Sequence, residues 1–165
     1  MAAFERAFAI VIGTEGGYVA NPADPGGETR FGISKRAYPN IDIPNLTLAA
    51  AQGIYRSDYW NRMRGDLLPP ALALVVFDAA VNSGVAQAVK WLQQTVGVQM
   101  DGVIGPVTLA GIQAHAGKGA ALVVDYLAHR NVFLTDLPTW RTFALGWSRR
   151  LAALPFHAYS MEQDQ

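Results

Sequence analysis

The chain has 165 residues, of which 51% are apolar and 16% are charged, and its formal net charge is zero. This composition predicts a single well-packed globule and excludes a disordered chain. Because the charges balance, the chain offers no bulk attraction to nucleic acid or anionic lipid, and we expect neither as a partner.

The residue types also exclude several chemistries. There is no cysteine and no HExxH pattern among the three histidines, so we expect no disulfide, no metal site and no cofactor. No G-x-S-x-G elbow is present, which disfavours a serine hydrolase. The longest apolar run, 67–81, is broken by Pro69-Pro70 and Asp78, so we expect no stable membrane insertion.

The first predicted element is a helix over residues 4–12, where apolar side chains recur at helical spacing. Gly16-Gly17 is expected to end this helix, which would place Glu15 in its last turn. There the negative end of the helix dipole and apolar neighbours would raise the pKa of Glu15. A raised pKa is what a general acid needs near neutral pH.

A loop rich in glycine and proline follows over residues 18–32, and a short β-hairpin is predicted near residues 29–33. Asp24 follows Glu15 by nine positions, and Thr29 follows Asp24 by five. A glutamate facing an aspartate and a threonine across one loop suits glycoside hydrolysis. One carboxylic acid protonates the leaving oxygen, while the second group positions water or stabilises the transition state.

The remaining chain predicts a series of helices, over residues 34–37, 47–60, 71–81, 85–96, from Pro106 onward, 120–134 and 140–154. The helix over 71–81 is apolar almost all round and should be buried at the centre. Asp78 in it must then be paired or hydrogen-bonded, and Asn82 near its end is a candidate sugar contact.

Two patterns stand out in the C-terminal part. Asp101-Gly102 before Gly105-Pro106 predicts a turn followed by a helix start. Trp140, Phe143 and Trp147 share one helix face and are expected to point into the core. The tail over 161–165 is expected to fray.

Several motifs together carry a family resemblance across nearly the whole chain: Glu15-Gly-Gly-Tyr18, Asp24-Pro-Gly-Gly-Glu28-Thr29 before Gly32-Ile33, Tyr59-Trp60, the run 77–84, Leu92-Gln93 before 101–106, and Gly146-Trp147 with a following arginine. Jointly they resemble glycoside hydrolase family 108, a group of lysozyme-like N-acetylmuramidases that cleave peptidoglycan. The order Glu15, Asp24, Thr29 is also similar to the active site of phage-type lysozymes, with the second gap one residue shorter here.

This resemblance implies a mainly α-helical, lysozyme-like fold with a Gly/Pro-rich active-site loop around the buried helix. It implies a catalytic part over residues 1–84 and a helical C-terminal part over 85–165, sharing one core and carrying a segment similar to small peptidoglycan-binding modules. The catalytic residues it implies are Glu15 as acid, with Asp24 and Thr29 positioning water or stabilising charge. Glu28 is the alternative second group. The candidate substrate contacts are Tyr18, Glu28, Asn82 and Asp101, and Asp101 is equally suited to a purely structural turn.

The implied function is hydrolysis of the β-1,4 bond between N-acetylmuramic acid and N-acetylglucosamine in bacterial peptidoglycan. The start of the chain carries no secretory signal pattern, so we expect synthesis in the cytoplasm and action in the periplasm or outside the cell. A monomeric phage or prophage endolysin released with the help of a holin fits these expectations. The alternatives are a secreted wall-degrading effector and a non-catalytic wall-binding or export-accessory protein.

Overall fold

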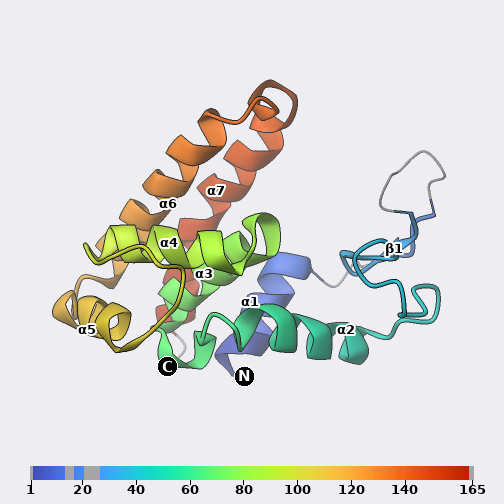
Figure 1. The fold of residues 1–165 in the computed structure, drawn as a ribbon, viewed down its shortest axis with the longest axis horizontal. Helices are drawn as coiled ribbons and strands as arrows, with labels where there is room; N and C mark the ends of the chain where they lie inside the picture. The colour runs from blue at the N-terminus through green and yellow to red at the C-terminus, as the bar shows by residue number, and fades with distance from the viewer. Residues whose placement is uncertain (1, 14–16, 21–26, 164–165) are drawn as a thin grey trace.

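The structure is a computed structural model that describes residues 2–13, 17–20 and 27–163 (Figure 1). Its elements in chain order are α1 (Ala3–Ile12), β1 (Thr29–Arg30), β2 (Ile33–Ser34), α2 (Leu48–Tyr55), a π-helical segment η1 (Arg56–Trp60), a 3-10 turn η2 (Gly65–Leu67), α3 (Pro70–Ser83), α4 (Val85–Thr95), α5 (Pro106–Ala114), α6 (Gly119–Thr135) and α7 (Trp140–Gln163). The described chain is therefore mainly α-helical, as predicted, with one two-stranded antiparallel sheet.

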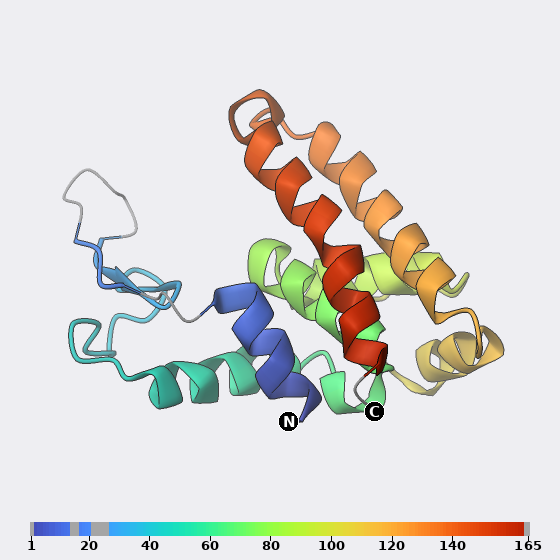
Figure 2. The ribbon, with the colours of Figure 1, turned by 180° about the vertical axis from the view of Figure 1, so that it is seen from behind.

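Helix α3 lies at the centre and packs against α1, α4, α6 and α7 (Figures 1 and 2). Pro70 at its first position suits a helix start, because an N–H there would have no acceptor within the helix, so the N–H that proline lacks is not missed. Every residue from position 71 to 80 is buried. Each fully buried Leu, Val or Phe side chain contributes roughly 1.5–3 kcal/mol. The prediction of a buried central helix over 71–81 is confirmed.

An aromatic cluster joins α1 and the α2–η1 segment to this central helix. The ring centroids of Phe4 and Trp60 are 5.4 Å apart, and those of Trp60 and Phe77 are 5.6 Å apart. Both pairs meet edge-on, an arrangement that aromatic rings favour. Gly65 leaves the space that Trp60 occupies, since a Cβ at this position would lie 2.4 Å from the indole ring. This half of the core thereby fixes the direction of α1, which leads towards Glu15.

Two predicted elements differ near the N-terminus. Helix α1 ends at Ile12, and Gly13, with φ of 75°, is the residue that ends it. The prediction that Gly16-Gly17 ends the helix is therefore wrong, and Glu15, predicted for its last turn, lies outside the described residues. The predicted helix over 34–37 is instead a hydrogen-bonded turn, in which the Ser34 hydroxyl accepts from the Ala37 N–H at 3.3 Å.

The hairpin and the second helix match their predictions. Thr29 pairs with Ser34 and Arg30 with Ile33, and the turn between them uses positive φ at Phe31 and Gly32. Thr47 caps α2 by accepting from the Ala50 N–H at 3.2 Å.

The C-terminal helix is longer than predicted and its aromatic stripe is less buried. Helix α7 continues through Pro155 to Gln163. The prediction that it ends at Leu154 is therefore wrong, and so is the prediction of a frayed tail for residues 161–163. Met161 is 1% exposed, and such burial offsets the roughly 3 kcal/mol that a proline costs inside a helix. Phe143 is 52% exposed and Trp147 is half-buried, so this stripe stands above the core and does not form part of it.

No helix in the described ranges combines the length and the apolar character that crossing a membrane requires.

Candidate active site

The described part of the candidate site is built on the β-hairpin. Val19 and Thr29 form an isolated antiparallel bridge, in which the Val19 N–H donates to the Thr29 carbonyl at 2.9 Å and the Thr29 N–H to the Val19 carbonyl at 2.8 Å. The chain thus returns to itself at Thr29. The two ends of the segment between positions 19 and 29, which includes Asp24, are held together by this bridge. Glu15 and Asp24 themselves lie outside the described residues.

Tyr18 and Glu28 flank this bridge and contact one another. The Tyr18 hydroxyl donates to the Glu28 carboxylate at 3.0 Å. That bond raises the pKa of the Tyr18 hydroxyl, because only the protonated hydroxyl can donate it, and the charge of the carboxylate adds to this effect. Three of the predicted site residues, Tyr18, Glu28 and Thr29, are therefore brought together at the hairpin.

Tyr55 of α2 anchors the hairpin to the helical body, a role that sequence reasoning missed. Its hydroxyl donates to the Phe31 carbonyl at 3.0 Å, and burial raises its pKa to about 12. Gly32 allows this approach, because a Cβ there would lie 2.6 Å from the Tyr55 oxygen. The glycine at position 32 was a visible sign of a close approach, but Tyr55, the residue that approaches, lies 24 positions from Phe31 in the chain.

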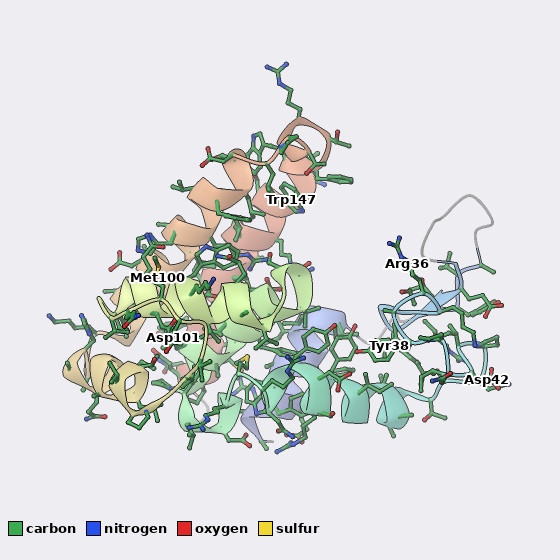
Figure 3. The ribbon with its side chains drawn as sticks, in the orientation of Figure 1. Arg36, Tyr38, Asp42, Met100, Asp101 and Trp147 are labelled. Atoms are coloured by element: carbon green, nitrogen blue, oxygen red, sulfur yellow. The ribbon has the colours of Figure 1, made fainter. Side chains whose placement is uncertain are left out.

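A second anchor beside the hairpin joins Tyr38 to η1. The Tyr38 hydroxyl donates to Asp58 at 2.8 Å, and burial together with this bond raises the pKa of the tyrosine. Figure 3 shows Tyr38 between the helical body and the loop that carries Asp42. With Tyr55, it fixes the hairpin relative to α2.

Beneath the end of α1 lies a buried ion cluster centred on Asp78. The Asp78 carboxylate, 2% exposed, is paired with Arg130 of α6 at 2.5 Å and with Arg150 of α7 at 2.6 Å. Arg150 also donates to the carbonyl of Val11 at 3.4 Å. Asp78 is paired, as predicted for a buried carboxylate, and the cluster ties α3, α6 and α7 to the last turn of α1, just before Glu15.

Asn82 lies one turn further along α3, with its side chain exposed. Its amide nitrogen donates to the Asp78 carbonyl at 2.7 Å. This bond within the helix fixes the side chain close to the helix surface. Contact of Asn82 with a sugar stays a prediction.

Asp101 lies far from the hairpin, on the side of the molecule opposite to Arg36 and Asp42 (Figure 3). Its carboxylate accepts from the Gln93 amide at 2.6 Å and from the Val103 N–H at 2.9 Å, which lowers its pKa. Gln93, 1% exposed, also bonds Gly102 and Thr108. Gln93 is thus the polar centre of this turn. The sequence pointed to it only as part of the Leu92-Gln93 motif before residues 101–106, which gave no structural role for its side chain.

We expect Asp101→Ala to lower the thermal stability of the protein and to leave turnover of a short chitooligosaccharide unchanged. Because folding lowers the pKa of Asp101, its ionised carboxylate stabilises the fold at pH values above the ordinary aspartate pKa, and this contribution is lost as pH falls. The difference in melting temperature between wild type and Asp101→Ala should therefore shrink below about pH 4. Calorimetry across pH measures this. Native stability with lost binding to insoluble peptidoglycan would instead show that Asp101 contacts the ligand.

Among the described residues, no group of three or more His, Asp or Glu side chains is arranged to hold a metal ion.

The fold and the hairpin site define a class, that of the mainly α-helical, lysozyme-like proteins. The family described as "Glycosyl hydrolase 108" matches residues 8–84, and that described as "Predicted Peptidoglycan domain" matches residues 87–152. The solved structure of SagA from Brucella abortus is 37% identical, with a TM-score of 0.86 over 98% of this chain and 97% of that one. A comparison with curated proteins found no match. The chain belongs to glycosyl hydrolase family 108 and is a glycoside hydrolase that acts on peptidoglycan.

Proposed function

We propose that this hydrolase is an N-acetylmuramidase, a lysozyme that cleaves the β-1,4 bond between N-acetylmuramic acid and N-acetylglucosamine. The observation that carries this proposal is the Val19–Thr29 bridge, because it closes the segment with Asp24 and gathers Tyr18, Glu28 and Thr29 beside it. The family membership supplies the reaction class, glycoside hydrolysis.

In the proposed mechanism Glu15 donates a proton to the leaving glycosidic oxygen as the bond breaks. Asp24 stabilises the oxocarbenium-like transition state or activates a water, and the Thr29 hydroxyl orients that water. Tyr18 and Glu28 bind the sugar beside them. NMR detection of the first anomer formed distinguishes two courses. If a carboxylate attacks and water then hydrolyses the glycosyl-enzyme, the configuration is retained, whereas direct attack by water inverts it.

Analysis of the products tests the proposed bond. Purified sacculi are digested, the new reducing ends are converted to sugar alcohols with borohydride, and the fragments are identified by mass spectrometry. A muramidase yields reduced N-acetylmuramic acid. Reduced N-acetylglucosamine would assign a glucosaminidase, and binding without soluble fragments would assign a non-catalytic wall binder.

Asp24→Asn should slow sacculus lysis nearly as much as loss of the general acid, because the second carboxylate then no longer stabilises positive charge. Thr29→Ser should cost little, since a hydroxyl remains on a strand whose backbone is fixed by Val19. Rates of turbidity loss measure both. A silent Asp24→Asn would transfer the second role to Glu28.

We also propose that a monomer acts on the wall in the periplasm or outside the cell, where peptidoglycan lies. Release of an endolysin through a phage or prophage holin is the proposed route, and secretion as an effector is the alternative. A neighbouring holin gene would support the first, and a secretion-system locus the second.

A further inference from the structure

A groove of about 470 Å³ lies between α4 and α6, on the part of the molecule away from the hairpin. Its floor is aromatic: the rings of Trp91 and Phe133 meet edge-on at 5.1 Å, and Phe133 remains 38% exposed. Its rim carries polar and charged side chains, which include Lys90, Gln94, His129 and Asp136. This size, with an apolar floor and a few polar groups, is typical of a ligand site.

The groove is held rigidly by buried contacts. Tyr126 of α6, fully buried, donates to the Ala88 carbonyl of α4 at 3.2 Å and so joins its two walls. On the adjacent side, the Gln93–Asp101 hydrogen bond fixes the turn that follows Met100, an exposed groove residue. A preformed groove binds with less loss of conformational entropy than a mobile one.

The charges of the rim discriminate between the two parts of peptidoglycan. N-acetylglucosamine is neutral and needs no charged partner. The stem peptide presents free carboxylates, diamino-acid side chains and alanine methyl groups. Lys90 and His129 suit the carboxylates, Asp136 suits an amine, and the Trp91–Phe133 floor suits the methyl groups.

We propose that this groove binds the stem peptide of peptidoglycan, as a second contact separate from the catalytic hairpin. The proposal rests on the proposed function only for the identity of the polymer. The groove residues fall within the segment that matches the predicted peptidoglycan domain, and Figure 3 places Met100 at the opposite side of the molecule from Arg36 and Asp42. Two contacts on one polymer raise the effective concentration of the enzyme at the wall.

The test compares Lys90→Glu with Lys118→Glu, an identical charge change at an exposed position outside the groove. Both are made with Glu15→Gln, so that the probes are not hydrolysed during the measurement. The probes are a soluble disaccharide tetrapeptide and chitotetraose, titrated by NMR. Lys90→Glu should weaken tetrapeptide binding by about fivefold, as expected when an exposed ion pair is reversed, and Lys118→Glu should not.

With Glu15 restored, Lys90→Glu should slow sacculus lysis and leave chitooligosaccharide hydrolysis unchanged. Phe133→Ala, with its melting temperature checked, should reproduce the binding defect. Equal binding in the two lysine variants, or groove shifts caused by chitotetraose as strongly as by the tetrapeptide, would overturn the proposal. Loss of all hydrolysis products would contradict the proposed muramidase and leave the groove result standing.

Discussion

Glu15→Gln should reduce the rate of sacculus lysis by at least a hundredfold. Glutamine has almost the same shape but cannot donate a proton to the leaving oxygen, and general acid catalysis typically contributes 10²–10⁴-fold. Because a sugar alkoxide is a poor leaving group without that proton, no other described side chain is expected to compensate. Binding to sacculi should persist, since the substrate contacts are unchanged.

The measurement is turbidity loss of purified sacculi, with melting temperature as a check on folding. The matched control is Glu5→Gln, the same substitution at a position on α1. It removes a half-exposed ion pair between Glu5 and Arg56, whose N–O distance is 3.4 Å. Such pairs contribute about 0–1 kcal/mol, so this variant should keep nearly full activity. If Glu15→Gln keeps more than about a hundredth of the wild-type rate, Glu15 is not the general acid.

Asp78→Asn should lower the free energy of unfolding by about 3–5 kcal/mol, the usual cost of removing one partner of a buried ion pair. Asparagine would leave Arg130, which is 3% exposed, without a counter-charge. For a chain of this length the melting temperature should fall by roughly 6–20 °C. Urea denaturation measures the loss directly.

Asp125→Asn on the exposed side of α6 is the matched control and should change stability by less than about 0.5 kcal/mol. Asp78→Leu combined with Arg130→Met should recover part of the loss, because apolar replacement of a whole buried pair is often neutral. A wild-type urea midpoint in Asp78→Asn would contradict the structural role of the cluster.

The elements that local sequence predicted well are those whose signal does not depend on distant residues. The run from 71 to 81 is apolar almost all round, which only a buried helix accommodates, and α3 is that helix. The hairpin follows from Gly32 at a turn position that requires positive φ. The mainly α-helical fold and the glycoside hydrolase family could likewise be predicted from the order of residues and motifs along the chain.

Other features were decided by tertiary packing. Helix α1 ends at Gly13, with φ of 75°, although Gly16-Gly17 offers a similar local signal a few residues later. Helix α7 passes through Pro155 because burial of Leu154, Ala158 and Met161 outweighs the missing hydrogen bond. The stripe from Trp140 to Trp147 has core-like spacing, yet the α6–α7 hairpin projects beyond the core there (Figure 2).

The sequence by itself determined which chemical groups this protein carries and which elements bear them, because helix periodicity and turn chemistry act over a few residues. Only the tertiary structure decided which groups meet. Asp78 pairs with Arg130 and Arg150, which lie 52 and 72 positions away in the chain. The Val11 carbonyl accepts from Arg150, which lies 139 positions away. The α4–α6 groove likewise has both Lys90 and Asp136 among the residues that line it. Such pairings depend on how the helices pack around α3, and no local pattern in the chain records that packing.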